Sequence, residues 1–270
     1  MDNIQTDVST GALITAIQAN LCDLFRLLSR ADPAEHYENG KFTRWHTPIP
    51  HPWFNGVLSS DPPTVDDDPF IDETVQYFRD KGVPAFTWWM EPHLKRSDWE
   101  PVLFRHGFGL TDDTPGMAVD LQAINESMPL PDGFEVRVVK DEDTLRTWAN
   151  IFVNGYGLPA GWESNVFDLW MKFGLELPTH NYLGYLNNRP VSASTVFKGG
   201  GVAGIYNVAT LPEARGKGLG TAMTLKPLQD ARAAGYRIGI LQPSDMGFNI
   251  YKKLGFRQLC QIENFYLSLE

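Results

Sequence analysis

The chain has 270 residues, of which 43% are hydrophobic and 21% charged, and its formal net charge is −10. A chain of this length can bury one large core or two smaller ones. The sequence holds no run near the roughly 20 apolar residues of a membrane span. Its first residues lack the basic region and cleavage site of a secretory peptide. We therefore expect a cytoplasmic protein without a membrane anchor.

Two features bear on metals and disulfides. Cys22 and Cys260 lie far apart and have no His or Cys neighbour at ligand spacing. This spacing argues against a disulfide framework and a structural zinc site. Each of the six histidines also stands without a ligand or nucleophile partner at a recognisable spacing. We expect neither a metal site nor a serine-type triad.

Charge is distributed unevenly along the chain. Residues 1–130 carry 9 basic and 20 acidic side chains, whereas residues 131–270 carry 14 and 13. Nucleic acids are bound by clustered Lys and Arg, so the acidic first half argues against such a partner. The composition favours a small ligand, with cations among the candidates.

The first half contains several predicted elements. Apolar residues at helical spacing predict an amphipathic helix over residues 12–29, which we expect to pack against a core. A proline-rich irregular stretch follows around Pro48, Pro50 and Pro52. Beyond it, the pattern predicts strands at 55–58 and 85–90 and helices over 69–81 and from Ser97 to Gly107.

A candidate linker precedes a second half with a different pattern. Residues 125–133 lack hydrophobic periodicity and contain turn formers, so we divide the chain into domains of residues 1–130 and 131–270. The second domain is predicted to contain strands at 134–139, 181–186, 190–197, 202–209, 237–242 and 257–267. One helix is predicted to begin at Asp141, and a second to run over 162–175. A third helix follows a Gly-rich turn at 216–220, includes Pro227 and ends at Gly235. A fourth extends from Ser244 to Gly255.

The two halves share a weak internal repeat. In the first half, the segment Phe78–Gly82 is followed by a predicted strand and then by Val102–Phe108. In the second half, Ala231–Gly235 is followed in the same order by a predicted strand and by Ile250–Phe256. In the first copy, the acidic segment Ser59–Asp68 occupies the place of the Gly-rich turn. Carboxylates there would repel a phosphate. A duplicated half-fold would explain the repeat, and its first copy would then have lost the ligand chemistry.

The segment Arg215-Gly-Lys-Gly-Leu-Gly220 follows a predicted strand and precedes a predicted helix. Three positions without side chains let backbone N–H groups close on an anion at the helix N-terminus. The spacing fits neither the Rossmann fingerprint nor a Walker A motif. The alternative interpretation is a Gly-rich turn whose cations are only solvated.

This segment resembles the motif Arg/Gln-x-x-Gly-x-Gly/Ala, with which the GNAT acyltransferase superfamily binds the pyrophosphate of coenzyme A. Arg215, Gly218 and Gly220 match it. The resemblance covers about residues 134–267, through the strand order, the segment Asn207–Pro212 and the segment Tyr251–Phe256. One departure is Ser244, where many members have an Asn that contacts the CoA arm.

The resemblance implies the fold class. It is an α/β fold, the GNAT acyl-CoA N-acyltransferase fold, with a mixed, splayed sheet and helices on both faces. His51–Leu58 and Gly116–Asp120 are similar to the degenerate first half of bacterial two-domain members. By this resemblance, residues 1–130 are a smaller, degenerate GNAT-like domain with a structural or pocket-forming role, and residues 131–270 are the catalytic domain.

The resemblance also implies the site. Acetyl-CoA would be the co-substrate, and Tyr251 the catalytic acid that protonates the leaving sulfur; without the resemblance, we would interpret Tyr251 as a core residue. The main chain of Val208–Thr210 would pair with the pantetheine arm like an added strand. The residues implied to contact CoA are Asn207, Val208, Ala209, Thr210, Arg215, Gly216, Lys217, Gly218, Leu219, Gly220 and Thr221.

Three aromatic residues are candidates for the acceptor side. Tyr156 and Trp162 lie in the connection between the first two helices of the second half, which borders the acceptor site in this superfamily. Trp88 and Trp89 must point to opposite faces of a strand, so Trp89 is a candidate for a cleft. Glu91 and Glu163 could attract an amine or act as base, although we favour solvated carboxylates as the interpretation of both.

We interpret the chain as an acyltransferase that moves an acetyl group from acyl-CoA to an amine of a small molecule by direct attack. Two alternatives stay open. In one, the acyl group differs or is delivered by an acyl carrier protein, since the pantetheine arm is common to both donors. In the other, the chain is a non-catalytic acyl-CoA-binding sensor.

Overall fold

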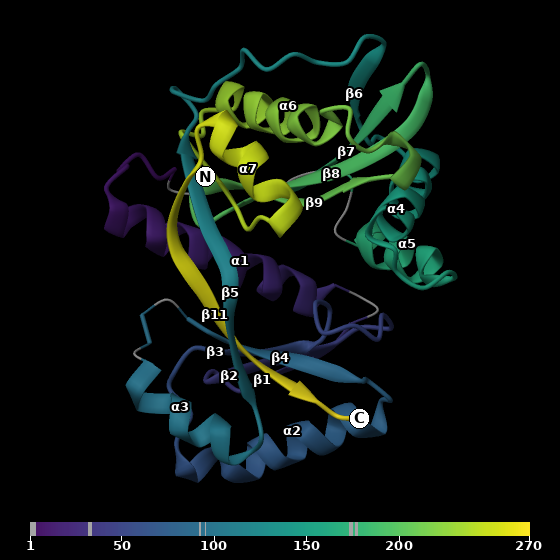
Figure 1. The fold of residues 1–270 in the computed structure, drawn as a ribbon. Coiled ribbons are helices and arrows are strands. Elements are labelled where there is room, and N and C mark those ends of the chain that lie inside the picture. The colour runs from purple at the N-terminus through teal and green to yellow at the C-terminus, as the bar shows by residue number, and fades with distance from the viewer. Residues whose placement is uncertain (1–3, 32–33, 92, 95, 173–174, 176–177) are drawn as a thin grey trace. The chain divides into compact units, whose positions relative to one another are not determined.

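A computed structural model describes the chain except residues 1–3, 32–33, 92, 95, 173–174 and 176–177 (Figure 1). The chain forms two compact units. Unit 1 comprises Met1–Leu21 and Pro115–Cys260, and unit 2 comprises Cys22–Thr114 and Gln261–Glu270. The helix α1 (Thr10–Arg30) and the strands β5 (Gly109–Asp120) and β11 (Arg257–Ser268) contribute residues to both.

Unit 1 contains a mixed sheet whose strand order is β5-β10-β9-β8-β7-β6. Only β10 and β9 run parallel among these neighbours, and the other pairs with a described register are antiparallel. Its remaining strands are β6 (Phe134–Val138), β7 (Thr179–Leu186), β8 (Arg189–Gly199), β9 (Val202–Thr210) and β10 (Ile238–Leu241). The mixed sheet confirms the predicted fold class.

Helices cover both faces of this sheet (Figure 1). The helix α6 (Leu219–Ala233), with η2 (Pro212–Ala214) before it and α7 (Asp245–Leu254) beside it, lies on one face, and α4 (Glu142–Tyr156) and α5 (Trp162–Lys172) lie on the other. Asp141 caps α4 as predicted, because its carboxylate accepts a hydrogen bond from the Thr144 N–H. The two faces therefore have separate helical layers.

Unit 2 has the same kind of architecture on a smaller scale. Its strands β1 (Glu35–Glu38), β2 (Phe42–His46), β3 (Gly56–Ser59) and β4 (Ala85–Met90) are followed in the sheet by the end of β11. The strands β3 and β4 are parallel, as β9 and β10 are in unit 1. The helices α2 (Asp68–Asp80), preceded by η1 (Val65–Asp67), and α3 (Arg96–Arg105) cover an aromatic core that includes Phe78, Phe86 and Trp88.

The predicted internal repeat is confirmed at the level of single hydrogen bonds. Gly107 and Gly255 both have positive φ, and they follow α3 and α7 respectively. The next N–H donates to the carbonyl five residues back in each copy, Phe108 to Leu103 at 3.2 Å and Phe256 to Tyr251 at 3.0 Å. Leu103 therefore occupies the position of Tyr251 in the repeat.

The division of the structure differs from the predicted boundary at 130/131. Residues 117–120 of β5 pair with β10 in unit 1, whereas residues 265–268 of β11 pair with β4 in unit 2. Each copy of the repeat thus completes its sheet with the strand that follows the other copy. Strand pairing joins residues distant in sequence, so a linker composition could not reveal this exchange.

Other local differences have local reasons. The stretch before Pro48, predicted as irregular, contains β2. The strands β1 and β5 were not predicted, because their sequences do not alternate cleanly between apolar and polar residues.

The helix α1 is long and apolar enough, by length and composition alone, to cross a membrane. It packs as a core helix, because the buried Asn20 amide donates to the Gly199 carbonyl at 2.8 Å and accepts from the Tyr206 hydroxyl at 2.7 Å.

Candidate functional site

The Gly-rich turn forms an open anion-accepting surface at the start of α6. Gly216 and Gly218 have φ of 77° and 76°, and Gly218 is the N-cap of the helix. A Cβ placed on Gly216, Gly218 or Gly220 would meet nothing within 4 Å. The first N–H groups of a helix have no acceptor inside it, and no acidic residue stands in the first turn. An anion can therefore approach these N–H groups closely.

Arg215 anchors this turn to two neighbouring elements. Its Nη2 donates to the Gly155 carbonyl at 2.7 Å, and its Nε donates to the Thr210 carbonyl at 3.2 Å. Arginine has five N–H donors, so three remain without a partner among the described residues. The exposed side chain of Lys217 adds a second cation to the turn. Arg215 thus combines a structural role with donors that an anion can use.

The end of β9 has an open edge beside this turn. The strand β10 pairs with Ala203–Ile205 and ends at Leu241, so the described strands provide no ladder partner for residues 207–210 on that side. The Leu211 N–H donates to Val191 of β8, so by alternation the N–H groups of Val208 and Thr210 face the open edge. An extended ligand can add to this edge as a strand does.

A β-bulge lies next to the open edge. Tyr206 pairs with Thr195 and Ala209 pairs with Ala193, so Asn207 and Val208 together face Ser194. Asn207 has φ of 56°, which is unusual for a residue other than glycine. A bulge bends its strand and redirects the groups beside it. The splay between β9 and β10 begins at this point.

Tyr251 lies on α7 and is buried against α6. Its ring packs beside Gly247, where an added Cβ would come within 2.7 Å of the ring, and its centroid lies 6.0 Å from that of Phe256. Burial raises the pKa of Tyr251, and a hydrogen bond with Thr224 acts in the opposite direction. The Thr224 hydroxyl in turn donates to the Gly220 carbonyl at 2.9 Å. These contacts connect the phenol to the first turn of α6.

The structure places Tyr156 and Trp162 in unit 1 with this site and Trp89 in unit 2. Burial, with a smaller electrostatic contribution from Tyr251, raises the pKa of the Tyr156 phenol. The Tyr156 ring is nevertheless 40% exposed and packs on Phe152 at 5.1 Å between centroids. Trp162 begins α5 and is partly buried. Trp89 belongs to unit 2, where its ring packs on Phe25.

The two glutamates already have structural partners. Glu163 accepts a hydrogen bond from the Gly161 N–H at 2.8 Å, and Glu91 forms an ion pair with Arg26. Neither carboxylate is a simple solvated group. The structure also adds two residues that the sequence pattern did not indicate, Thr224 and Gln242. The Gln242 side-chain nitrogen, just beyond β10, is buried, and the part of the chain that the structure describes offers it no hydrogen-bond partner.

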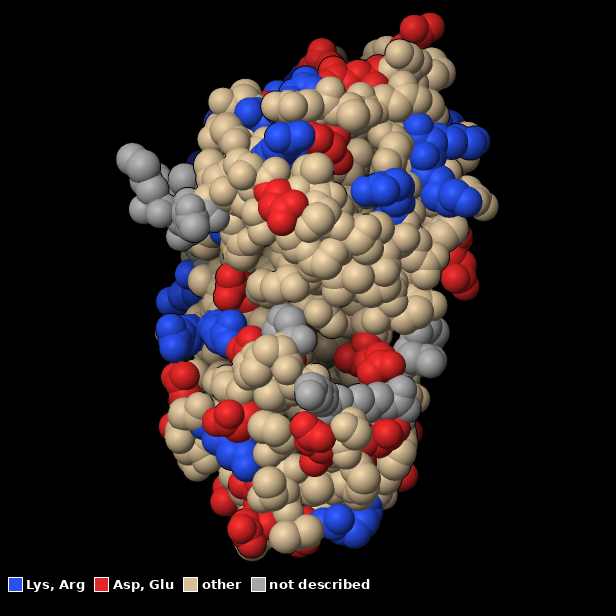
Figure 2. All heavy atoms as spheres, turned by 90° about the vertical axis from the view of Figure 1, so that its left-hand side faces the viewer, with Lys and Arg blue, Asp and Glu red and all other residues tan. Residues whose placement is uncertain are grey.

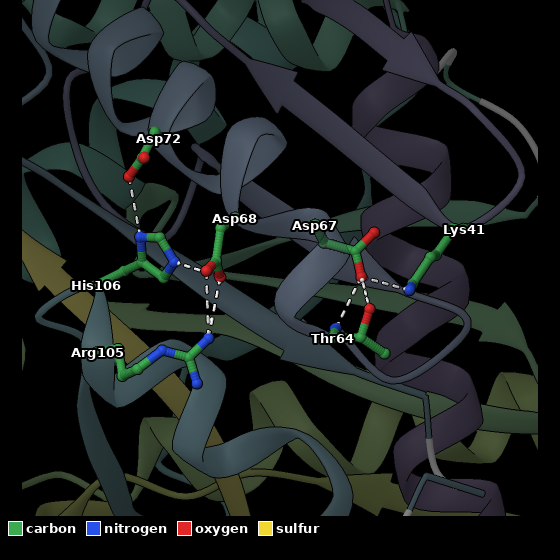
Figure 3. A network of polar contacts seen from close by, with 7 residues as sticks. All are labelled: Lys41, Thr64, Asp67, Asp68, Asp72, Arg105 and His106. Carbon is green, nitrogen blue, oxygen red and sulfur yellow. Dashed lines mark hydrogen bonds and ion pairs between the residues drawn. The ribbon is translucent and has the colours of Figure 1, made fainter.

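The corresponding region of unit 2 is closed by ion pairs (Figure 3). Asp67 accepts hydrogen bonds from the Thr64 N–H at 2.7 Å and from Lys41. Asp68 contacts Arg105 at 3.1 Å and His106 at 2.9 Å, while the other ring nitrogen of His106 contacts Asp72. The helix α2 thus starts with carboxylates that already fill its first turn, and this arrangement excludes a phosphate.

Two further observations limit the chemistry. Within the described part of the chain, no group of three or more His, Cys, Asp or Glu side chains could hold a metal ion. On the face drawn in Figure 2, acidic and basic side chains are interspersed, and the described residues there form no extended basic surface. Nucleic acids need such a surface.

Comparisons with known proteins agree with this geometry. Residues 195–259 match the family model of an acetyltransferase (GNAT) domain. This match covers the bulge, the turn and α7. No curated protein matches the chain significantly in sequence.

Solved structures resemble the whole chain. A GCN5-related N-acetyltransferase from Kribbella flavida aligns with a TM-score of 0.66 and 19% identity, over 94% of this chain and 95% of that chain. One from Sphaerobacter thermophilus aligns with a TM-score of 0.60 and 13% identity, over 87% and 82%. A tandem GNAT protein from the clavulanic acid biosynthesis pathway aligns with a TM-score of 0.56 and 11% identity, over 98% and 96%. Residues 195–259 therefore match a GNAT acetyltransferase domain model, and the chain as a whole has the GNAT fold with a second, related half.

Proposed function

We propose that the chain is an acyl-CoA-dependent N-acyltransferase that moves an acetyl or other short acyl group to an amine of a small molecule. One observation carries the proposal. The end of β9 places an open strand edge between an anion-accepting helix N-terminus and a buried phenol. These are the parts needed to hold a pantetheine arm, a pyrophosphate and a leaving sulfur.

The residues fit acyl-CoA in two respects. The space around Gly216, Gly218 and Gly220 is open, and Arg215 and Lys217 supply positive charge beside it. Residues 207–210 have no ladder partner among the described strands at the adjacent edge, so their backbone groups there can pair with an extended ligand. A pyrophosphate site favours free CoA over a carrier protein as the donor, because a carrier-bound pantetheine has a single phosphate attached to protein. The retained phenol of Tyr251 favours an enzyme over a sensor.

Bound acyl-CoA would supply an activated thioester. The chain's part is to position it, because holding donor and acceptor together replaces a bimolecular encounter. The Val208 N–H at the open edge would donate to the carbonyl oxygen while negative charge develops there. Tyr251 remains a protonated phenol at neutral pH, since burial raises its pKa, and it would donate its proton to the leaving sulfur.

The test combines a thiol-release assay with a matched pair of glycine variants. Acetyl-CoA is offered with a panel of amines, amino acids and amino sugars, and we expect release of thiol with at least one class. Gly218→Ala puts a Cβ into the space by the turn, whereas Gly82→Ala adds one at a positive φ of 68° in open space in unit 2. We expect the dissociation constant for CoA to rise about tenfold in the first variant only.

Two results would contradict the proposal. One is wild-type protein that does not bind CoA in calorimetry. The other is a folded Gly218→Ala variant with the CoA affinity of Gly82→Ala, since the turn would then not be the pyrophosphate site.

A further inference from the structure

The bulge in β9 is held by a chain of three polar side chains, of which two are buried. The Asn207 amide donates to the Thr195 hydroxyl at 3.2 Å, and this hydroxyl donates to the Asn181 side-chain oxygen at 2.7 Å. Asn181 and Thr195 are each 3% exposed. They lie directly opposite each other on β7 and β8. The three side chains therefore cross three neighbouring strands.

The direction of these hydrogen bonds is set by chemistry. A threonine hydroxyl has one proton, and Thr195 gives it to Asn181. Thr195 must then accept at its oxygen, and only the NH₂ end of the Asn207 side chain can donate to it. The orientations of the Asn207 and Asn181 amides are thus coupled through the Thr195 hydroxyl across three strands.

These side-chain hydrogen bonds support an unusual main-chain conformation at Asn207. Asn207 adopts φ of 56°, a conformation in which asparagine is better tolerated than most side chains but which still needs support. It is the residue immediately before Val208, whose N–H faces the open edge. A change in the conformation of Asn207 rotates the peptide that carries this N–H.

We propose that Asn181, Thr195 and Asn207 form a positioning relay, which holds the bulge so that the Val208 N–H points at the acyl carbonyl. Asn207 then acts through the main chain and does not contact CoA with its side chain. The relay rests on the proposed function, because it assigns these residues to the step in which negative charge develops on the carbonyl oxygen. Donors aimed at that charge lose most of their effect when they are misdirected.

Thr195→Val and Thr195→Ser test the relay. The valine removes the hydroxyl and keeps the shape, and the serine restores the hydroxyl. The control is Ser192→Ala on the same strand, because the buried Ser192 hydroxyl has no hydrogen-bond partner among the described residues. We expect kcat of Thr195→Val to fall about tenfold or more, with the CoA dissociation constant within about twofold of wild type. Thr195→Ser should recover most of kcat.

A second pair of variants separates conformation from contact. Asn207→Gly removes the side chain and adopts positive φ without strain, whereas Asn207→Val is a β-branched residue that adopts it poorly. Both variants should lose kcat, the valine more than the glycine, while CoA affinity stays near wild type. Equal loss of CoA affinity in both would show that the side chain contacts CoA, and would overturn the relay.

The amide exchange rate of Ala209 gives a readout that does not depend on turnover, because Ala209 pairs with Ala193 of β8 directly beside the bulge. We expect it to rise at least about fivefold in Thr195→Val relative to Ser192→Ala, since the bulge opens more often without its anchor. Equal exchange rates, or kcat of Thr195→Val within twofold of the control, would overturn the relay. Failure of the proposed function would instead appear as wild-type protein that does not bind CoA, and the exchange rates still decide whether the relay holds the bulge.

Discussion

Tyr251 shows how single residues define this site. Its phenol is buried, and its neighbours are a glycine one helical turn earlier, an aromatic ring and the Thr224 hydroxyl. Gly247 leaves room for the ring, because a Cβ there would overlap it. The ring therefore has one position, and its hydroxyl is directed to the first turn of α6.

Replacing Tyr251 with Phe should remove a proton donor and little else. The ring and its packing persist, so we expect CoA affinity near wild type and kcat lower by about 10²–10⁴-fold. Burial raises the pKa of Tyr251, so the phenol stays protonated through pH 10, and its ionisation should not reduce kcat below that pH. The measurement is kcat under conditions where chemistry limits turnover. Wild-type kcat in the Phe variant would exclude Tyr251 as the acid.

Arg215 should affect both stability and binding. Arg215→Ala removes hydrogen bonds to the Gly155 and Thr210 carbonyls, so we expect a loss of about 1 kcal/mol in unfolding free energy together with weaker CoA binding. The control is Arg189→Ala, since Arg189 is 71% exposed and pairs with Glu213. Chemical denaturation and calorimetry measure the two effects. If Arg215→Ala matches the control in both, the anchoring role is wrong.

At the scale of elements, α6 continues through Pro227 as one helix from Leu219 to Ala233. Proline has no N–H for the carbonyl four residues earlier, which belongs to Met223. The Ser194 hydroxyl of β8 donates to this carbonyl at 2.8 Å, and both residues are fully buried. A neighbouring strand thus supplies the hydrogen bond that the helix lacks at Pro227.

This arrangement predicts a coupled pair of mutations. Ser194→Ala leaves the Met223 carbonyl without a donor and should lower the unfolding free energy by about 1–3 kcal/mol. In a Pro227→Ala background the new N–H can serve that carbonyl, so the cost of Ser194→Ala should shrink by about 1 kcal/mol. Denaturant unfolding of the four proteins measures the coupling. Identical costs in both backgrounds would show that the hydroxyl does not replace the missing N–H.

At the scale of the molecule, the two copies of the repeat have the same backbone pattern but differ in the residues at the start of one helix and at the position of Tyr251. Both end their helices with a positive-φ glycine and the same backbone hydrogen bonds. Only unit 1 has an open turn at the start of its first repeat helix. In unit 2 the corresponding helix start is filled by Asp67 and Asp68 with their cationic partners, and Leu103 stands where unit 1 has Tyr251.

The chain should therefore bind one CoA. Titration calorimetry on the full chain is expected to give a stoichiometry near one, because unit 2 offers no anion-accepting helix start. Two equivalent sites would contradict this. A fragment of residues 131–270 is not a suitable substitute, since it lacks the β5 residues that pair with β10 and the α1 residues that belong to unit 1.

Much of the site was predictable because it depends on local rules. Glycines that permit positive φ, a helix N-terminus after a strand, the Asp141 cap and the glycine helix ends are each set by a few consecutive residues. The resemblance of Arg215–Gly220 and of Tyr251–Phe256 to one family added the expected ligand. The internal repeat was visible for the same reason, since each copy keeps its own helix-ending signals.

Only the tertiary structure decided the rest. The exchange of β5 and β11, the contact of Arg215 with Gly155, and the alignment of Asn181, Thr195 and Asn207 each join segments distant in sequence. Thr195 and Asn181 show no motif, because their role comes from strand register, which is set by the whole sheet. The sequence by itself determined where an anion can bind and how each half folds. The packing of strands determined which segments complete each half and how the bulge beside the turn is held.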